Sequence, residues 1–310
     1  MTNSSNIPAG SSGRAGFVGL GTMGFPMASN LAKAGYSLWV FDTSASALDR
    51  AKALPGVTIA ASPADVARHA DVVFTCLPNN DIVLKAYLGP DGLSSGAHPG
   101  LVTCDCSTVS PEVTVEIHKA LKTKGIHHMD TPMLGSQPQA VDGQIFFIVG
   151  GAAEAMAKIK PHLDVMGKLH MHVGPAASGN KIKLIHNGMA AMTSVVVAEG
   201  LAMAVNSGVD PAIFYEVVRN GGGMAYGTYF ERRAKRVLEG EFSPTFMLEL
   251  MRKDAGLALQ LAEQLHVPAP MLKETKATYD EAFEAGWGKE DFSAVTHVIE
   301  RRIGRKLSSK

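Results

Sequence analysis

The stretch at residues 15–42, AGFVGLGTMGFPMASNLAKAGYSLWVFD, constrains the fold more than any other part of this chain. Two short apolar runs, at 17–18 and 38–41, flank a glycine-rich turn and a helical pattern that ends at Gly35. Strand, turn, helix and second strand in this order form the βαβ unit of a parallel α/β sheet. We therefore expect a sheet covered by helices to begin here.

The turn has the spacing Gly-x-Gly-x-x-Gly, with glycines at 19, 21 and 24, and an aspartate stands at 42. The first glycine permits a tight turn, the second lets the backbone approach a pyrophosphate, and the third allows close packing of helix on strand. The aspartate follows by about 20 residues, where a carboxylate accepts hydrogen bonds from a ribose. A glycine turn can serve structure alone, but this context favours dinucleotide binding. The predicted contacts are Gly19, Leu20, Gly21, Thr22, Met23, Gly24 and Asp42.

Asp42 also bears on which dinucleotide is bound. A carboxylate at this place repels the 2′-phosphate of NADP, and the residues that follow, Thr43, Ser44 and Ala45, bring no cation to receive it. The sequence therefore predicts NAD as the cofactor.

Composition excludes several kinds of partner. The 310 residues carry 29 Lys and Arg against 29 Asp and Glu, so no net charge attracts nucleic acid or an anionic membrane. The three cysteines, two of them in Cys104-Asp105-Cys106, lack zinc-site spacing and predict reduced thiols in a cytoplasmic protein. Packing is favoured over a redox role for this pair. The histidines form no ligand set with neighbouring carboxylates, so we expect no metal site.

Two segments resemble targeting or membrane signals. Residues 1–14 are rich in Ser, Gly and Asn and lack the apolar core of a signal peptide, so we expect a flexible N-terminal segment. Residues 188–205 are long and apolar enough for a membrane span, but Glu199 lies in the middle among small residues. A helix buried in protein is the favoured interpretation, and we expect no membrane partner.

The α/β alternation continues beyond this first unit and places polar residues where strands end. The predicted strand at 71–77 is closed by the turn Leu77-Pro78-Asn79, and the strand at 101–106 is followed by Thr108. Both turns lie at the carboxyl edge of the sheet, where ligands of open α/β sheets bind. The Thr108 hydroxyl serves either a ligand or a helix cap, and its position does not decide between the two.

The pattern changes to helix upon helix near residue 178, which predicts two domains. Residues 15–177 are expected to form the NAD-binding Rossmann domain and residues 178–310 an all-helical domain. The first helix of the second domain, near 179–207, would span about 40 Å. It is apolar nearly all round, so we expect it to be buried as the spine of its domain.

Three polar residues, Asn180, Lys183 and Asn187, interrupt the start of this apolar helix. Their spacing of three and four residues places them on one face. Partial burial lowers the pKa of an ammonium group toward the range useful for acid–base catalysis, so Lys183 is a candidate for protonating an aldehyde oxygen. Asn187 would orient it or bind a substrate hydroxyl. The alternative is a lysine that snorkels to solvent, and spacing alone leaves the two interpretations about even.

Six segments occur in an order that matches a known family. They are GLGTMGFPMASNLAKAG, LPNN, DCSTVSP, DTPMLGSQPQAVDG, GNKIKLIHN and FMLELMRKD, within residues 16–303. This order resembles the β-hydroxyacid dehydrogenase family, of which 3-hydroxyisobutyrate dehydrogenase is the best-known member. The resemblance implies an α/β Rossmann domain followed by an all-α domain that carries substrate and oligomer contacts, joined by the long buried helix. It also implies NAD-dependent interconversion of a short β-hydroxyacid and its semialdehyde, by a homodimer or homotetramer.

The resemblance assigns roles by position. Lys183 looks like the family's catalytic general acid/base, and Asn187 looks like its substrate-side asparagine. Thr108, the turn Leu77-Pro78-Asn79 and Lys253 look like contacts of the nicotinamide half of the cofactor. The resemblance thus favours the catalytic interpretation of Lys183. It also singles out Lys253. By sequence alone, Lys253 and the residue after it would be interpreted as an ordinary charged pair on a helix.

Two positions depart from the family pattern. The family usually has Ser-Gly-Gly, which holds the substrate carboxylate, where this chain has Leu134-Gly135-Ser136 followed by the polar Gln137. We expect Leu134, Gly135, Ser136 and Gln137 to contact the substrate anion in a pocket of altered shape. His186 stands where the first of two asparagines is common. Packing is its favoured role, and titration beside Lys183 is the alternative.

These departures leave the hydride chemistry intact and the substrate open. Sequences of the sulfolactaldehyde reductase type also depart from Ser-Gly-Gly in this loop, and tartronate and succinate semialdehyde are further alternatives. A non-catalytic dinucleotide-binding sensor is the alternative from another class, which the presence of Lys183 disfavours. Imine reduction is disfavoured too, because relatives that perform it generally carry another residue at the lysine position.

Overall fold

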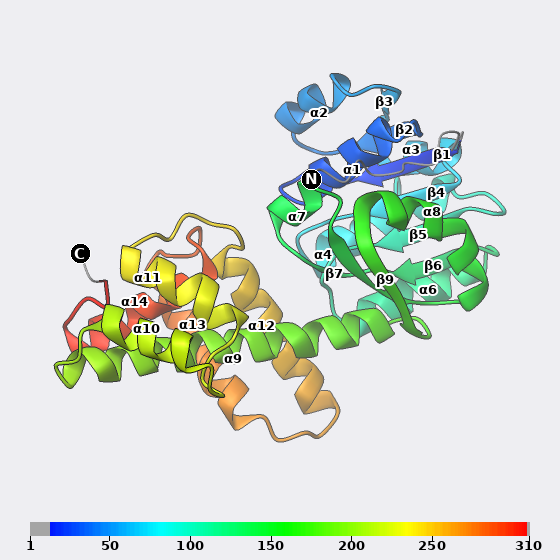
Figure 1. Ribbon diagram of the computed structural model, residues 1–310. Helices are drawn as coiled ribbons and strands as arrows, with labels where there is room; N and C mark the ends of the chain where they lie inside the picture. Colours follow the sequence, from blue (N-terminus) through cyan, green and yellow to red (C-terminus); the bar gives the residue numbers. More distant parts are fainter. Residues whose placement is uncertain (1–12, 309–310) are drawn as a thin grey trace. The chain divides into compact units, whose positions relative to one another are not determined.

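The computed structural model describes residues 13–308, which divide into two compact units (Figure 1). Unit 1 ends at Lys183, and unit 2 begins at Leu184. Most of the flexible segment expected at 1–14 lies outside the described residues, and the first strand begins at Arg14. The predicted fold class, an α/β Rossmann domain followed by an all-helical domain, is confirmed.

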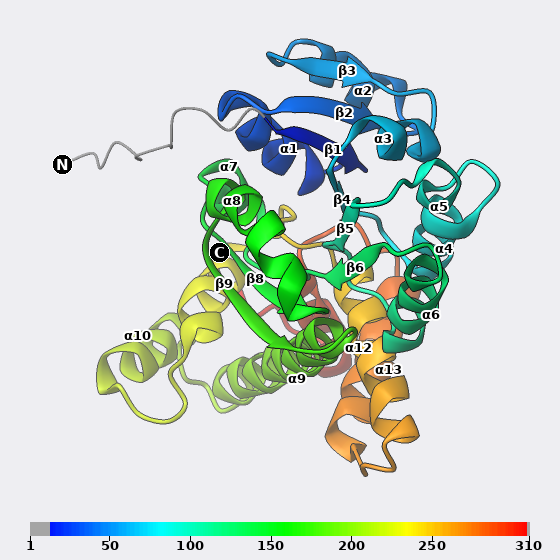
Figure 2. The same cartoon turned by 90° about the vertical axis from the view of Figure 1, so that its right-hand side faces the viewer.

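Unit 1 is built on a nine-stranded sheet in which six parallel strands follow the order β3-β2-β1-β4-β5-β6 (Figure 2). They are β1 (Arg14–Val18), β2 (Ser37–Phe41), β3 (Val57–Ile59), β4 (Val72–Thr75), β5 (Val102–Asp105) and β6 (His127–Asp130). The strand order reverses beside β1, which creates a topological switch point between β1 and β4. Ligands of such sheets bind at the carboxyl ends of these two strands.

The remaining strands depart from the parallel pattern. β8 (Ile145–Gly150) runs antiparallel to β6 and to the short β7 (Met133–Leu134), and β9 (Gly167–Gly174) pairs parallel with β8. β9 is absent from the strands expected from the sequence, although the alternation of Leu169, Met171 and Val173 is a strand signal. Leu169 and Met171 are about half exposed, so the face of β9 that carries them is only partly covered by other residues.

Helices cover both faces of the sheet. They are α1 (Gly24–Lys33), α2 (Ala45–Lys52), α3 (Pro63–His69), α4 (Asn80–Leu88), α5 (Leu93–Gly96), α6 (Pro111–Lys122), α7 (Gln137–Val141), a 3₁₀ turn (Ala153–Ala155) and α8 (Met156–Met166). α3 and α6 each begin with a serine cap and a proline in the first turn. Phe17 and Phe74 belong to one apolar cluster, and their neighbours Val18 and Val73 belong to another. This division follows from the alternation of side chains along a strand.

The described part of unit 2, residues 184–308, is built of helices, apart from one isolated β-bridge between Met247 and Asp291. The helices are α9 (Ser178–Asn206), which begins in unit 1, α10 (Pro211–Gly221), a π-helical turn (Phe230–Ala234), α11 (Lys235–Glu239), α12 (Leu248–Gln264), α13 (Pro270–Glu284), a 3₁₀ turn (Phe292–Val295) and α14 (Thr296–Ile303). Residues 228–239 are continuously helical, with π-helical geometry at Phe230–Ala234 before α11. Leu184, Leu248 and Tyr279 are fully buried in the main core of this unit.

The expected burial of the long helix α9 is only partly correct, because the helix is buried along one side and exposed along the other. Leu184, Ala191 and Leu201 are fully buried, whereas Met189 and Met203 are 60% and 68% exposed. By length and a mean hydropathy of 1.6, α9 meets the requirements of a membrane span, with 44% of its apolar window buried. The core helix of a globular domain meets the same requirements, so this criterion is weak.

Glu300 on α14 is a buried carboxylate that ties the following residues to unit 2. It accepts hydrogen bonds from Leu307 N at 2.8 Å, Lys306 Nζ at 2.9 Å and His297 Nδ1 at 2.9 Å. Burial by itself raises the pKa of Glu300, but these hydrogen bonds outweigh burial and lower the pKa to about 2. The ionised form of Glu300 is therefore favoured in the folded state.

We expect Glu300→Gln to remove part of the acid sensitivity of this protein. A carboxyl group whose pKa is lowered by folding stabilises the fold above its unfolded pKa of about 4.3, and this contribution is lost as the pH falls through that value toward the folded pKa. The urea midpoint of the variant should lie below that of the wild type at neutral pH and approach it near pH 3. The exposed Glu284 on α13 provides the control variant Glu284→Gln. A midpoint difference for Glu300→Gln that stays constant between these pH values would contradict the prediction.

Candidate functional site

The glycine turn after β1 leaves no space for a side chain at two of its three glycines. Gly19 has φ +93°, a left-handed conformation that favours glycine. A Cβ on Gly19 would collide with the carbonyl oxygen of Cys76, and a Cβ on Gly24 would collide with the carbonyl oxygen of Gly19. The turn therefore packs closely against the loop after β4 and against the start of α1.

The middle glycine of the turn faces open space. A Cβ on Gly21 would meet no atom within 4 Å, and both Gly21 and Thr22 are exposed. α1 begins next to it, and its N-cap residue Met23 makes no side-chain capping hydrogen bond. The first turn of α1 thus presents main-chain N–H groups and the positive end of the helix dipole. These features fit the pyrophosphate of a dinucleotide.

Asp42 follows β2 and is hydrogen-bonded to the glycine turn. Its Oδ2 accepts from Leu20 N at 2.6 Å, and its Oδ1 accepts from Ser44 N at 2.7 Å. Each carboxylate oxygen has a further lone pair, so Asp42 is able to accept ribose hydroxyls while it holds the turn. The glycine turn fits the pyrophosphate that NAD and NADP share, and Asp42 fits the adenosine ribose.

The loops after β4 and β5 are tied together at the carboxyl edge of the sheet. Leu77 N donates to Ser107 Oγ at 2.8 Å, and Ser110 N donates to Asn80 Oδ1 at 3.1 Å. Asn79 is the N-cap of α4 and accepts from Ile82 N at 3.0 Å. The structure therefore brings together the turn at 77–79 and the loop of Thr108, which is half-buried. Their predicted contacts with a cofactor stay predictions.

In the predicted anion loop, the donors of Ser136 already make hydrogen bonds within the protein. Gly135 has φ +144°, and a Cβ there would crowd Ile145 and Gln139. Ser136 N and Ser136 Oγ both donate to Gln139 Oε1, at 2.9 and 2.6 Å, in a capping box at the start of α7. Gln137 is exposed, and Leu134 is half-buried in β7. Ser136 would therefore have to release Gln139 before its own donors reach an anion.

A buried aspartate fixes the start of α9. Asp130, at the end of β6, is fully buried, and its two oxygens accept from Ala177 N and Asn180 N, each at 2.8 Å. Burial raises the pKa of Asp130, and the hydrogen bonds from Asn180 and Ala177 oppose that rise. Side chains at Gly150 or Gly179 would collide with this carboxylate. α9 is thereby held to the central sheet of unit 1 at its first turn.

Asn180 extends this anchor to the loop that carries Thr108. It is fully buried, its Oδ1 accepts from Val109 N at 3.4 Å, and its Nδ2 donates to Thr114 Oγ1 at 3.1 Å. Lys183 lies one turn further along α9 on the same face and is half-buried. The side chain of Asn180 therefore makes hydrogen bonds that serve the structure of unit 1. It also fixes the helix turn from which the Lys183 side chain extends.

In unit 2, Asn187 and Lys253 both contact the carboxylate of Asp254. Asn187 Nδ2 donates to Asp254 Oδ2 at 2.6 Å, and Lys253 Nζ lies 2.9 Å from Asp254 Oδ1. Asn187 and Asp254 are 4% and 2% exposed. By sequence alone, Asp254 is half of an ordinary helix pair, because its burial is not visible in the sequence. The segment FMLELMRKD, in which an aspartate follows the singled-out lysine among apolar residues, is the signal that points to it.

The thiols lie outside this arrangement. All three cysteines are free, and burial raises the pKa of Cys76 to about 12, with Asp105 adding to the rise. Buried thiols with raised pKa values are poor nucleophiles. Among residues 13–308, no group of three His, Cys, Asp or Glu side chains could hold a metal ion.

Two family models together match nearly all of the described chain. The NAD binding domain of 6-phosphogluconate dehydrogenase matches residues 14–174. The model described as NAD-binding of NADP-dependent 3-hydroxyisobutyrate dehydrogenase matches residues 177–299. The glycine turn, Asp42 and the start of α9 therefore lie within segments typical of NAD(P)-dependent dehydrogenases.

Individual relatives agree with these models. The chain is 36% identical over 296 residues to 3-sulfolactaldehyde reductase of Escherichia coli (strain K12), covering 95% of this chain and 97% of that protein. It is 35% identical over 294 residues to NAD-dependent L-serine dehydrogenase of Pseudomonas aeruginosa, covering 93% and 98%. The solved structure of Mycobacterium tuberculosis 3-hydroxyisobutyrate dehydrogenase with L-serine superposes with a TM-score of 0.84 at 28% identity, covering 93% and 99%. The expected resemblance is confirmed: this chain belongs to the β-hydroxyacid dehydrogenase family, whose members are NAD(P)-dependent enzymes acting on hydroxyl groups of hydroxyacids.

Proposed function

We propose that this protein interconverts a short β-hydroxyacid and its semialdehyde with NAD, and that Lys183 is the general acid/base. The observation that carries the proposal is the row of Asn180, Lys183 and Asn187 on one face of α9, whose first turn is anchored to the sheet by Asp130. A lysine on an anchored, half-buried helix turn is restricted in the positions that its amino group can reach. This restriction is what proton transfer at a defined oxygen requires.

Lys183 would hold and move the proton of the reaction. In reduction, its ammonium donates a proton to the carbonyl oxygen of the semialdehyde, and in oxidation its neutral amine accepts the proton of the alcohol. A bound nicotinamide supplies or receives the hydride at the carbon of the same group. Proton and hydride together account for the two-electron change, so the reaction balances without a further reactant.

Asn187 and Lys253 would assist from unit 2. The Asn187 amide is held by Asp254 in one orientation, with one N–H directed to the carboxylate and the other remaining for a substrate hydroxyl. Lys253 is kept beside Asp254, and we infer that it contacts the nicotinamide half of the cofactor. Thr108 and the turn Leu77-Pro78-Asn79 are proposed for the same half.

The proposed preference for NAD rests on Asp42. Its carboxylate is fixed by two main-chain N–H groups at the end of β2, so it cannot turn away from a ligand without losing both bonds. A 2′-phosphate placed beside it would meet like charge. We therefore expect NADH to be the better substrate.

The substrate is proposed as a small acid whose anion is bound by residues 134–137. This loop lacks the serine that the family usually places first, and its own Ser136 donates to Gln139. A second candidate substrate is therefore sulfolactaldehyde, in keeping with the 36% identity to 3-sulfolactaldehyde reductase. A sulfonate has three acceptor oxygens and suits main-chain and amide donors such as those of Gln137.

The test is a set of initial rates with the purified protein. We expect saturable oxidation of NADH with one of methylmalonate, tartronate or succinate semialdehyde or sulfolactaldehyde, at a kcat/KM about tenfold or more above that with NADPH. Turnover of sulfolactaldehyde alone would favour the second candidate. Equal use of NADPH would refute the role given to Asp42. Tight NADH binding without turnover of any of these four aldehydes would contradict the proposed reaction.

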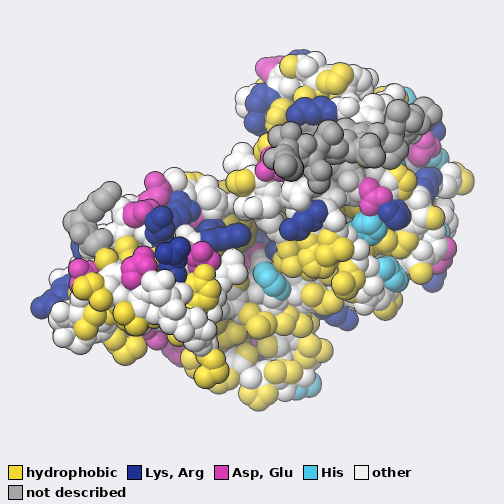
Figure 3. Space-filling view, viewed as in Figure 1, with side chains coloured by type: hydrophobic (Ala, Val, Ile, Leu, Met, Phe, Trp, Pro, Cys, Tyr) yellow, Lys and Arg dark blue, Asp and Glu magenta, His cyan; other side chains and the backbone are white. Residues whose placement is uncertain are grey.

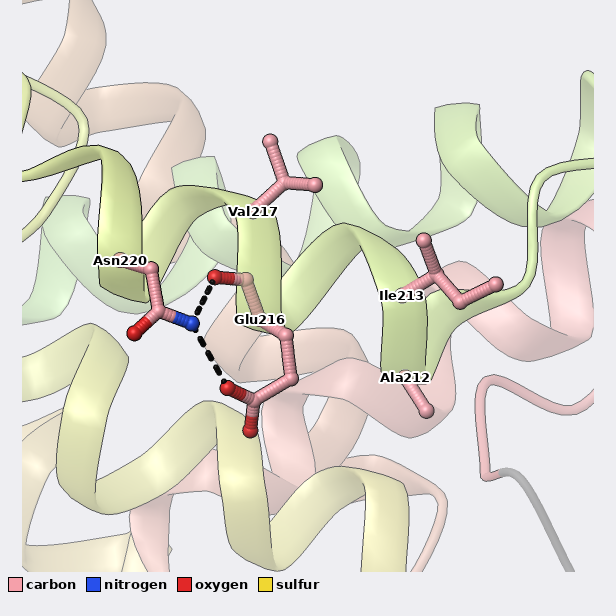
Figure 4. Close-up of a pocket in the computed structure, with 5 residues that line it drawn as sticks. All are labelled: Ala212, Ile213, Glu216, Val217 and Asn220. Carbon is pink, nitrogen blue, oxygen red and sulfur yellow. Dashed lines mark hydrogen bonds between the residues drawn. The ribbon is translucent and has the colours of Figure 1, made fainter.

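We further propose a homodimer or homotetramer formed through unit 2. Hydrophobic side chains gather on the face of this unit seen in Figure 3. α10 bears an open hollow of about 450 Å³ lined by Ala212, Ile213, Glu216, Val217 and Asn220 (Figure 4). This hollow contains none of the predicted site residues, and Ile213 and Val217 are 61% and 64% exposed there. Such a surface supports subunit contact rather than substrate binding.

Two further assignments complete the proposal. We propose residues 15–177 as the NAD-binding domain and residues 178–310 as the domain for substrate and oligomer contacts. Free thiols at all three cysteines support a cytoplasmic location.

A further inference from the structure

We infer that His186 is a positioning residue that locks the Asn187 amide in its working orientation, an inference that rests on the proposed function. His186 Nδ1 lies 3.0 Å from Asn187 Oδ1. On its other side, Asn187 Nδ2 donates to Asp254 Oδ2 at 2.6 Å. The Asn187 amide is therefore held at both ends, by two residues of unit 2 on different helices.

The donors and acceptors in this chain follow from chemistry. An aspartate carboxylate paired with Lys253 accepts hydrogen bonds only, so the NH₂ group of Asn187 must face Asp254. The Oδ1 of Asn187 then faces His186, and the imidazole must donate through Nδ1–H. This bond fixes the proton of His186 on Nδ1 in the neutral ring.

The contact is not an automatic result of helix geometry. Successive side chains on a helix diverge by about 100° and do not face each other. His186 is exposed and has solvent available, whereas Asn187 is 4% exposed. The exposed ring therefore turns back along the helix to satisfy a buried carbonyl that would otherwise lack a donor.

The bond has a consequence for the site. With Oδ1 held by His186 and one N–H held by Asp254, Asn187 keeps one N–H in a fixed direction, one helix turn beyond Lys183. Without His186, the amide loses one of its two restraints, and its free N–H samples more than one direction. The asparagine that is common at this position in the family carries an N–H donor too, so His186→Asn is a matched conservative variant.

The experiment compares His186→Ala, His186→Asn, Asn187→Ala and the double variant His186→Ala/Asn187→Ala. We expect His186→Ala to lower kcat about tenfold, the effect of one lost hydrogen bond in the transition state, with the Kd of NADH changed less than about twofold. His186→Asn should recover most of that loss. In the Asn187→Ala background, His186→Ala should have no further effect, since a residue that acts only through Asn187 is coupled to it. His266→Asn changes another exposed histidine of unit 2 and is the control.

A second readout does not depend on turnover. The side-chain ¹H–¹⁵N signals of Asn187, assigned by their loss in Asn187→Ala, should shift in His186→Ala and stay in place in His266→Asn. Unshifted signals, unchanged kcat in His186→Ala, or effects of the two alanines that multiply would overturn the inference. Failure of His186→Asn to recover kcat would also overturn it, because His186 would then act through its own ring. If the wild type turns over no semialdehyde, the proposed function fails, whereas the NMR shift still tests the bond.

Discussion

Lys183→Ala is expected to lower kcat by about 10² to 10⁴, the range that general acid–base catalysis supplies. The alanine side chain has no amino group to exchange a proton with the substrate oxygen. NADH binding should persist, because the glycine turn and Asp42 are formed by other segments of unit 1. Stopped-flow reduction of the semialdehyde measures kcat, and quenching of NADH fluorescence measures its Kd.

Two comparisons separate catalysis from structure in this variant. Lys181 is an exposed lysine two residues earlier on the same helix, and Lys181→Ala should keep kcat within about twofold of the wild type. A small primary amine added to Lys183→Ala should restore part of the activity, because it replaces the missing proton donor. If the kcat of Lys183→Ala is close to that of the wild type, Lys183 is not the general acid/base.

Asp254→Asn is expected to lower kcat/KM by about 10- to 100-fold, which is the effect of losing one charge-assisted hydrogen bond. The substituted amide matches the aspartate in shape but has one acceptor instead of two. One side of it must then present N–H to the NH₂ of Asn187 or to the ammonium of Lys253, where no bond forms. We also expect a loss of stability on the order of 3 kcal/mol, since one partner of a buried ion pair is removed.

A surface carboxylate of α13 that pairs with α12 gives the control. Asp280 pairs with Arg252 and Lys276 and is about a third exposed. Asp280→Asn should lower the urea midpoint slightly and leave kcat/KM unchanged, because exposed pairs contribute little. If Asp254→Asn loses stability but keeps the wild-type kcat/KM when fully folded, then Asp254 serves structure alone.

The start of unit 1 could be predicted because its signals are local. The glycines at 19, 21 and 24 and the apolar strands around them lie within 28 consecutive residues. A side chain at Gly19 or Gly24 would collide with the backbone, whereas Gly21 leaves open space where a pyrophosphate can approach. Ser62 and Ser110, each followed by proline, are local signals of the same kind and lie where α3 and α6 begin. Strand ends and helix starts of this kind depend on neighbouring residues, which a sequence displays directly.

The end of unit 1 was harder to predict. The turn-rich loop at 130–138 forms the short strand β7 and leads into the five-residue helix α7, and β8 reverses direction relative to β6. Whether a strand pairs parallel or antiparallel depends on which strand lies beside it, and a strand's own residues do not state this. The side of α9 that is exposed was not predicted either, because both of its sides are apolar.

By itself, the sequence determined the βαβ start, the order of the two units and the polar face of α9, because helix and strand periodicity fix which residues share a side. Only the tertiary structure decided which carboxylates hold the site residues in place. Asp130 reaches Asn180 across 50 residues, and Asp254 reaches Asn187 across 67. Bonds between such distant segments depend on how a whole unit packs, and no local pattern of residues contains that information.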